Sequence, residues 1–419
     1  MLISVITPTH SPAHLSDCWE SLRAQTDTAW EWILVPNGGV GTLPQDIVTD
    51  RRVRVFPATD AALQGSIGAL KHFATQHAQG DLIVELDHDD MLAPDCLATL
   101  RARADCAKPQ MLYSDFALVD SGLAPWAYPE SAGWRTYPWR FRGHALLATK
   151  AFAPTPSNLH WLQFAPNHVR AWTRLGLEAG GGFNPARSVA DDYELILKCY
   201  AADCEFVQIP QCLYVYRRHP GATTDDPATC KRIGAAQAEI ANLYLESCIT
   251  AWCRREELRC LHLSAFQSAE TPYELLTPVP ARVDDRYQFS FDGVADNSVG
   301  YVTIREYLEY LPPDAAVPLF EELYRVLAPG GCVSATAPSA DFPGGYASPA
   351  YRSRWNQATF LTWCRRDYAV RAGVTTARFA RLRSWDTWYS PDEYRDKLFY
   401  VRVDLAALKG QDQAGRIEI

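Results

Sequence analysis

The stretch GDLIVELDHDD at residues 80–90 decides the fold of the first half of this chain. Its middle part, LIVEL, has the length and composition of a buried strand, and the acidic part, DHDD, follows at once. Strand-like runs at residues 2–7, 32–35 and 53–56 alternate with helical spacing at residues 15–25 and 67–77. This alternation predicts parallel strands joined by right-handed crossovers, and hence an α/β sheet.

Polar clusters follow three of these predicted strands. They are PTH at residues 8–10, PNG at residues 36–38 and DHD at residues 87–89. In open α/β sheets, ligands bind beyond the carboxyl ends of the strands. The three clusters therefore predict a binding site at one edge of the sheet.

Asp87 and Asp89 are the residues at this edge best suited to a metal ion. Side chains two apart at a strand end point to the same side. Two such carboxylates can hold a hard divalent cation that also binds diphosphate oxygens. An acidic turn explains the pair about equally well, and Asp90 fits the N-cap of a following helix.

The composition narrows the class of protein. A chain of 419 residues is too long for one hydrophobic core, so two domains are expected. The net charge of −9 argues against general nucleic-acid binding, which needs a basic face. The 12 cysteines include no CxxC pair, and most lie in apolar runs, as reduced thiols do in a reducing compartment.

No signal peptide is expected at the start of this sequence. Its start lacks the basic residues of a signal peptide and reaches Pro8 early. No stretch approaches the roughly 20 apolar residues of a membrane span. A cytoplasmic protein is therefore expected, with peripheral membrane contact and homo-oligomerisation left open.

The second part of the predicted first domain is less regular. Residues 126–161, rich in Pro, Trp, Tyr and Arg, are expected to form a long ordered loop region. Within it, Trp134, Trp139 and Trp161 are candidates for an acceptor-sugar platform, although packing is the safer reading of any one of them. A helix with an acidic start is expected at residues 189–200, and one long helix at residues 228–258.

Five motifs over residues 1 to about 225 resemble, in order and spacing, those of family-2 glycosyltransferases with the GT-A fold. They are ISVITPTH (3–10), WESLRAQT with WEWILV (19–26 and 30–35), GDLIVELDHDD (80–90), ADDYEL (190–195) and LYVYRRH (213–219). The resemblance implies a Rossmann-like nucleotide-sugar-binding domain. It also implies transfer of a sugar, with inversion, from a nucleoside-diphosphate sugar to an acceptor hydroxyl.

The same resemblance implies roles for individual residues. Asp192 would be the general base, with Asp191 as the alternative because the register of an acidic pair is ambiguous. The metal ligands for Mn²⁺ or Mg²⁺ would be Asp89, Asp87 and His219. The nucleotide sugar, with a UDP-sugar favoured, would contact Pro8, Thr9, His10, Asn37, Lys71, Asp87, His88 and Arg218.

Simpler explanations and departures from the family pattern stand beside these roles. On the simpler explanations, Asp192 is a carboxylate that complements the dipole at the start of a helix. His219 is then a turn residue, and Arg218 is a solvated surface charge. The second strand usually ends in Asp-Asp-Gly-Ser in this family, whereas here it reads PNGG at residues 36–39. His72 stands where an asparagine is frequent.

The second half resembles another family. The runs DNSVGYV (296–302), EYLEYL (306–311) and LYRVLAPGG (323–331) resemble the latter half of class I S-adenosylmethionine-dependent methyltransferases. The glycine-rich cofactor turn is missing, because no glycine occurs between Gly234 and Gly293. A smaller α/β, methyltransferase-like domain without bound S-adenosylmethionine is therefore expected.

The predicted domains are residues 1–227 (transferase), 228–258 (linking helix), 259–410 (methyltransferase-like) and 411–419 (tail). The favoured function is a metal-dependent glycosyltransferase of surface polysaccharide or other glycan synthesis. The alternatives are a bifunctional glycosyltransferase and methyltransferase, and a non-catalytic scaffold of a glycan-assembly complex. The expected partners are a nucleotide-sugar donor and a glycan or lipid-linked acceptor, and no nucleic acid.

Overall fold

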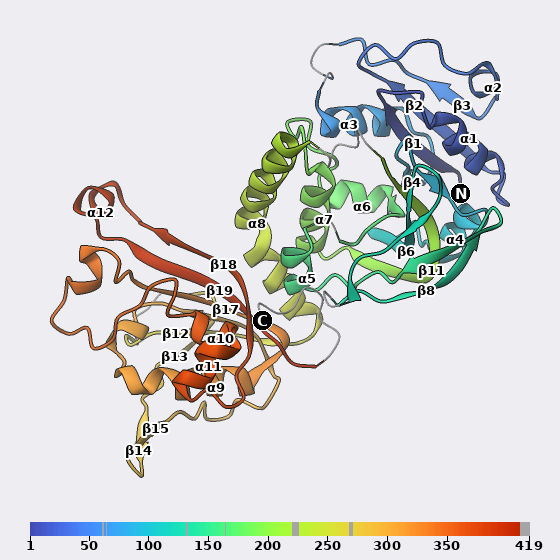
Figure 1. Ribbon diagram of the computed structural model, residues 1–419. Helices are drawn as coiled ribbons and strands as arrows, with labels where there is room; N and C mark the ends of the chain where they lie inside the picture. Colours follow the sequence, from blue (N-terminus) through green and yellow to red (C-terminus); the bar gives the residue numbers. More distant parts are fainter. Residues whose placement is uncertain are drawn as a thin grey trace. The chain divides into compact units, whose positions relative to one another are not determined.

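The computed structural model of the protein describes residues 1–60, 63, 65–130, 133–163, 165–219, 226–267 and 271–410 (Figure 1). The chain divides into two compact units. Unit 1 comprises Met1–Pro154 and Leu162–Cys248, and unit 2 comprises Thr155–Trp161 and Ile249–Ile419. The predicted tail, residues 411–419, lies outside the described residues.

Unit 1 is built on one mixed sheet, and its first four paired strands are parallel, as predicted. They are β1 (Ile3–Thr9), β2 (Trp30–Pro36), β3 (Val53–Val55) and β4 (Leu82–Glu85). The order β3-β2-β1-β4-β10-β6-β11-β5 continues with the short strand β10 (Arg170–Thr173), which is antiparallel to both of its neighbours. The other strands on this path are β6 (Gln110–Asp120), β11 (Glu205–Arg218) and β5 (Met91–Leu92).

Helices of unit 1 bury the apolar stripes that their sequences present. In α1 (Leu15–Arg23), the spacing of Leu15, Cys18 and Leu22 places them on one buried face together with Trp19. The Trp19 ring stacks on Trp32 of β2 with ring centroids 5.6 Å apart. The remaining helices that lie wholly in unit 1 are α2 (Gln45–Val48), α3 (Ile67–His77), α4 (Cys96–Arg103), α6 (Arg174–Ala179) and α7 (Asp191–Ala201).

The prediction of a long loop over residues 126–161 is wrong. Strands β8 (Thr136–Phe141) and β9 (His144–Thr149) form an antiparallel hairpin, and β9 also pairs with β6. Tyr137, Trp139 and Phe141 alternate toward an apolar cluster, while the residues between them are exposed. This period of two is typical of a half-buried strand, but proline and charge at the exposed positions conceal it.

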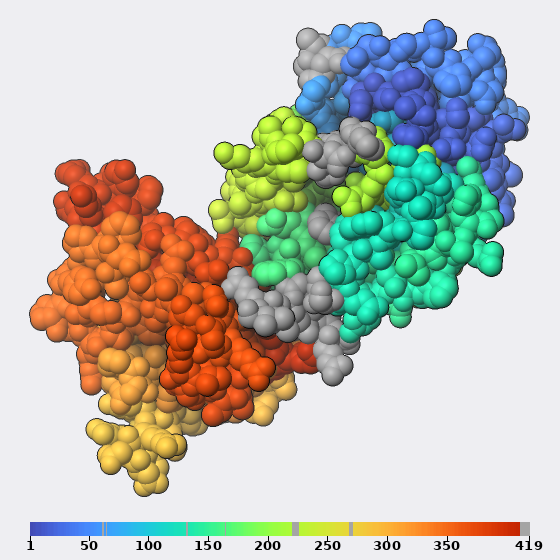
Figure 2. Space-filling view, viewed as in Figure 1, coloured from blue at the N-terminus to red at the C-terminus, as the bar shows by residue number. Residues whose placement is uncertain are grey.

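A single long helix, α8 (Pro227–Arg255), follows β11, as its spacing predicts. Its residues before Ile240 are exposed or half-buried, and part of their surface is visible in Figure 2. Among the described residues, none of the helices combines the length and the hydropathy that crossing a membrane requires.

Unit 2 contains a six-stranded sheet in the order β13-β12-β16-β17-β19-β18. Four strands are parallel: β12 (Arg259–Leu263), β13 (Glu274–Leu276), β16 (Val299–Ile304) and β17 (Leu327–Pro338). β19 (Tyr400–Ala407) is inserted antiparallel between β17 and β18 (Phe379–Thr387).

The helices of unit 2 are α5 (Pro156–Trp161), α9 (Ala316–Val326), α10 (Leu361–Cys364), α11 (Arg366–Ala372) and α12 (Pro391–Asp396), and β14 (Ala281–Val283) pairs with β15 (Arg286–Gln288) as a separate hairpin. The core of the unit includes a stack of Phe320 on Trp363, with ring centroids 3.9 Å apart.

Candidate active site

The carboxyl ends of β1, β2 and β4 meet at one edge of the sheet because these strands are parallel. Pro8 and Thr9 close β1, Asn37 follows β2, and residues 87–90 follow β4. The Asn37 amide donates a hydrogen bond to the Thr9 carbonyl oxygen over 3.0 Å. The predicted polar clusters therefore lie together at this edge.

Asp87 and Asp89 lie in a turn after β4 and not within the strand. The prediction that their side chains point to the same side rested on the alternation along a strand, which therefore does not apply to them. The carboxylate of Asp87 lies 3.6 Å from His168 Nε2. The carboxylate of Asp89 lies 2.9 Å from His219 Nε2. Burial raises the pKa of Asp87 to about 7, and the charge of Asp89 adds to the rise.

Asp90 does not cap a helix, contrary to prediction. Its buried carboxylate accepts hydrogen bonds from the Tyr214 hydroxyl (2.8 Å) and from the backbone N–H of Arg217 (2.7 Å). The next helix, α4, begins only at Cys96. Asp90 instead ties the acidic turn to β11, and the Tyr214 hydroxyl also accepts a hydrogen bond from the backbone N–H of Asp87 over 3.2 Å.

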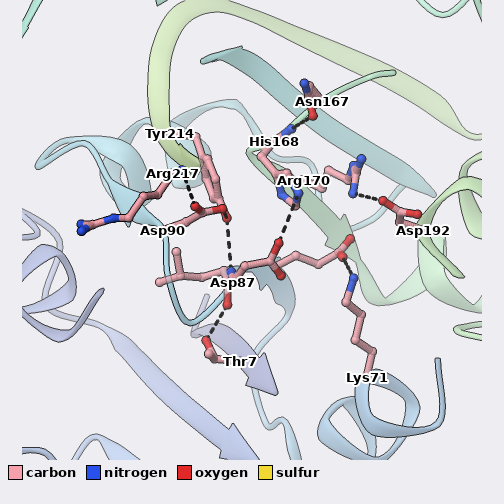
Figure 3. A network of polar contacts seen from close by, with 12 residues as sticks. Thr7, Lys71, Asp87, Asp90, Asn167, His168, Arg170, Asp192, Tyr214 and Arg217 are labelled. Atoms are coloured by element: carbon pink, nitrogen blue, oxygen red, sulfur yellow. Dashed lines mark hydrogen bonds and ion pairs between the residues drawn. The ribbon is translucent and has the colours of Figure 1, made fainter. Parts of the chain in front are cut away.

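Asp192 lies in the first turn of α7 and is paired with a buried arginine (Figure 3). Arg170 NH1 donates to the Asp192 carboxylate over 2.6 Å. Burial acts to raise the pKa of Asp192, but the charges of Arg170, Lys71 and His168 outweigh it and lower the pKa below its ordinary value. Asp192 is therefore ionised at neutral pH.

Asp191, the alternative base, has a different environment. Its side chain is 5% exposed, against 26% for Asp192. Lys71 Nζ lies 3.2 Å from the Asp191 carboxylate and 2.7 Å from that of Glu85. Burial raises the pKa of Asp191 to about 6, although the charge of Lys71 opposes the rise.

Lys71 is itself buried within this pair of carboxylates. Burial acts to lower its pKa, but the charges of Asp191 and Glu85 raise it well above the ordinary value. In this structure one ammonium is shared between two carboxylates in the interior of unit 1. Its predicted contact with a diphosphate stays a prediction.

The approach to β10 joins the two halves of the site, as Figure 3 shows. His168 faces Asp87, and Arg170, two residues on, faces Asp192. Sequence reasoning missed both residues. The signal for them is an alternation of His168 and Arg170 at the start of the apolar run VRAWT at residues 169–173.

Histidines surround the acidic turn. The rings of His10 and His88 are in edge contact with centroids 4.7 Å apart. The rings of His14 and His219 lie 5.0 Å apart. Arg218, the last predicted contact of the nucleotide sugar, is exposed, and its guanidinium lies 4.3 Å from the ring centroid of Trp126.

The carboxylate and histidine side chains at this edge could supply only part of the ligands of a metal ion. Among the described residues, no three His, Cys, Asp or Glu side chains are grouped so that they could hold a metal ion. Asp89 and His219 are already adjacent, at 2.9 Å. Mg²⁺ is usually held by one or two carboxylates together with substrate phosphates and water, so this pair is compatible with a divalent ion that arrives with a diphosphate.

Comparison with known proteins identifies the class of the N-terminal region. Residues 4–159 match the family model described as glycosyl transferase family 2. The match covers less than half of the chain, and it places a glycosyltransferase family 2 domain in the N-terminal region; all but the last five matched residues lie in unit 1. Within the described residues, no helix is long and apolar enough to span a membrane.

One curated relative is the "Uncharacterized protein y4gI" of Sinorhizobium fredii, which is 27% identical over 237 residues. The alignment covers 53% of this chain and 23% of the relative, so the chain spans under a quarter of the relative's length.

Similar solved structures include S. aureus TarS, with a TM-score of 0.43, 17% identity, and coverage of 61% of this chain and 42% of that chain. A second is S. aureus TarS 1–349 in complex with UDP, with a TM-score of 0.43, 16% identity, and coverage of 62% and 72%. GalNAc-T7 with UDP, GalNAc and Mn²⁺ gives a TM-score of 0.40, 14% identity, and coverage of 61% and 51%. At these scores, the similarities say nothing about the substrate of this chain.

Proposed function

We propose that unit 1 is an inverting glycosyltransferase that moves a sugar from a nucleoside-diphosphate sugar to an acceptor hydroxyl. The observation that carries the proposal is the link made by residues 168–170, because it joins the acidic turn at Asp87 to Asp192 at the start of α7. The family 2 match over residues 4–159 supports the same reaction class.

Asp192 is the general base in this proposal, and Asp191 is not. A general base must come within hydrogen-bond reach of the acceptor hydroxyl. Asp192 is the more exposed carboxylate of the two, whereas Asp191 is buried against Lys71. Arg170 orients Asp192 and keeps it ionised, so that it can take the proton as the hydroxyl oxygen attacks the anomeric carbon.

The donor binds at the carboxyl ends of β1, β2 and β4. The nucleotide lies against Pro8, Thr9, His10 and Asn37. Asp89 and His219 hold a divalent cation, Mn²⁺ or Mg²⁺, with Asp87 nearby. When bound, the cation neutralises the charge of the leaving diphosphate. A UDP-sugar donor and an acceptor in surface polysaccharide synthesis belong to the same proposal.

Unit 2 is proposed to be a methyltransferase-like domain that does not use S-adenosylmethionine. The antiparallel insertion of β19 beside four parallel strands supports the resemblance. Between β12 and β16, where the strand order reverses, a cofactor would be expected beyond the strand ends. There the backbone N–H of Ala265 donates to Glu306 (3.0 Å), and that of Arg305 donates to Leu263 (3.1 Å), so the two loops are joined.

Thermal stabilisation by nucleotide sugars tests the proposal for unit 1. A ligand at 100 times its Kd stabilises the folded state by about 2.7 kcal/mol. With Mn²⁺ present, at least one member of a UDP-, GDP- and dTDP-sugar panel is expected to raise the melting temperature of the protein. If no member raises it, the donor site is refuted.

A pair of variants tests the catalytic base. Asp192→Asn is expected to keep the stabilisation by the donor and to lose sugar transfer. Asp46→Asn, an exposed aspartate in α2, serves as the control and keeps both. Transfer retained by Asp192→Asn would place the base elsewhere. Isothermal titration with S-adenosylmethionine tests unit 2, and micromolar binding would favour the bifunctional alternative.

A further inference from the structure

Alternate residues of β11 place aromatic and cationic side chains on one face of the unit 1 sheet. Tyr214, Tyr216 and Arg218 are two residues apart in this strand, so their side chains leave the same face. On the neighbouring strand β6, Leu118 pairs with Tyr216. Leu118 pairs in turn with Trp126 of β7 (Pro125–Trp126), so Trp126 lies on this face as well.

The inner end of this row lies at the acidic turn that follows β4. The Tyr214 hydroxyl donates to Asp90 over 2.8 Å. The His168 ring stacks on Tyr214 with ring centroids 4.6 Å apart and lies 6.2 Å from the ring of Tyr216. His168 Nε2 in turn lies 3.6 Å from Asp87. The row therefore begins at the carboxylates and continues outward along β11.

The outer end of the row is a supported, exposed tryptophan. Trp126 is 36% exposed, whereas Tyr214 is fully buried. Tyr128 contacts the Trp126 ring at 4.9 Å and stacks on Trp134 at 4.6 Å. Trp134 is buried and contacts Phe152, so a chain of aromatic contacts connects Trp126 to the interior. The indole is held in place at the surface.

Arg218 completes the outer end. Its guanidinium lies 4.3 Å from the Trp126 ring centroid, and no carboxylate of the described residues pairs with it. The guanidinium therefore has donors to offer to a ligand, beside an aromatic surface. Aromatic rings stack on the C–H face of a pyranose, while the sugar hydroxyls need hydrogen-bond partners at the rim. Indole and guanidinium together supply both.

We infer that Tyr216, Arg218 and Trp126 form an acceptor strip, which the buried His168 and Tyr214 support, and that Trp126 binds a pyranose ring of a glycan acceptor, remote from the reacting hydroxyl. The inference rests on the proposed function and extends it to the acceptor. It replaces the predicted platform. Of the three tryptophans of that platform, Trp134 stacks on Tyr128 behind Trp126. Trp139 packs in the hairpin, and Trp161 belongs to unit 2.

The sheet order separates the acceptor strip from the proposed nucleotide pocket. That pocket lies at β1 and β2, and β4 and β10 stand between those strands and the pair β6 and β11. Stacking of the donor's base on Trp126 is therefore disfavoured by position. An acceptor that enters along the strip passes from the exposed Trp126 toward the carboxylates, which is the direction that transfer requires.

Saturation-transfer NMR with three disaccharides tests the acceptor strip without knowledge of the natural acceptor. The probes are cellobiose, maltose and N,N′-diacetylchitobiose. The protein is expected to saturate the pyranose C–H protons of at least one of them. Trp126→Ala should weaken that binding by about fivefold or more, the loss expected for one stacking contact. Trp161→Ala, a tryptophan of similar exposure in α5, is the control and should bind as the unchanged protein does.

Two further measurements keep the outcomes distinct. Trp126→Phe retains an aromatic face and should bind nearly normally, which separates stacking from misfolding. Stabilisation by UDP with Mn²⁺ should be equal in all variants. If UDP stabilises the protein but no disaccharide binds, or if Trp126→Ala binds as well as Trp161→Ala, the inference is wrong while the proposed function stands. Loss of UDP stabilisation in Trp126→Ala would assign the strip to the donor instead. If disaccharide binding depends on Trp126 but no nucleotide stabilises the protein, the strip binds glycans and the proposed function fails.

Discussion

Glu309 of unit 2 offers a quantitative test of burial and charge. It lies just beyond β16, is 4% exposed, and its Oε2 has no hydrogen-bond partner among the described residues. Burial raises the pKa of this carboxyl from 4.5 to about 7, and the charge of Glu306 adds to the rise. One step in pKa corresponds to about 1.4 kcal/mol, so ionisation of Glu309 in the folded state costs about 3 kcal/mol.

The sign of the pH dependence follows from proton binding. Between pH 4.5 and about 7, the folded state holds a proton on Glu309 that the unfolded state has released. The contribution of Glu309 to the stability of unit 2 is therefore most favourable below pH 4.5, becomes less favourable as the pH rises, and is lower by about 3 kcal/mol above pH 7. Glu309→Gln is uncharged at every pH and escapes this loss. The variant should exceed the unchanged protein by about 3 kcal/mol at pH 8, with the advantage disappearing near pH 4.5.

Native-state hydrogen exchange, read by mass spectrometry on peptides covering Val299–Ile304, measures this difference inside unit 2. Variant and unchanged protein are compared at the same pH, so the intrinsic exchange rate cancels. Glu306→Gln removes an exposed charge three residues away and should shift protection only slightly. Equal protection of Glu309→Gln and the unchanged protein at pH 8, or an advantage that does not change with pH, would refute the reasoning.

Further predictions concern the interior of unit 1. Arg170→Met removes the main positive charge beside Asp192, so the pKa of that base should rise. The acid limb of the pH profile of sugar transfer should then move to higher pH. If the limb does not move, the role of Arg170 is contradicted. Lys71→Met leaves Glu85 with an unpaired buried charge and should destabilise the protein by about 3–5 kcal/mol in urea unfolding, whereas a loss below 1 kcal/mol would show that water reaches the site. Gly80→Ala places a Cβ 2.6 Å from the backbone nitrogen of Ser4 and should lower the melting temperature by several degrees, as measured by circular dichroism.

The elements that the sequence predicts well are those with local signals. The apolar stripe of α1 and the apolar runs of β1, β2 and β4 can each be recognised from a stretch of about ten residues. Their alternation is enough to predict an α/β sheet, and the parallel order places the polar clusters at one edge. The hairpin of β8 and β9 was not predicted, because Pro138 and Arg140 at its exposed positions are residues typical of loops.

The site was predictable in its residue types but not in its pairings. That Asp87 and Asp89 face different histidines depends on a turn whose shape no spacing rule gives. Arg170 meets Asp192 over 22 positions of sequence, and His219 meets Asp89 over 130. Such partners are chosen by how the strands order themselves in the sheet, so they become visible only when the fold is known.

The short helix α5 has a consequence for how the protein is made. Thr155–Trp161 belongs to unit 2, although the chain on both sides of it belongs to unit 1. His160 Nε2 meets the carbonyl oxygen of Leu382, 222 positions later, at 2.5 Å. At a synthesis rate of about 5–20 residues per second, roughly 10 to 45 s pass before that partner emerges from the ribosome. During the later part of this delay, once Cys248 has been made, the nascent chain carries a helix of its second unit within a first unit whose sequence is complete, and a gene fragment beginning at residue 249 would never encode that helix.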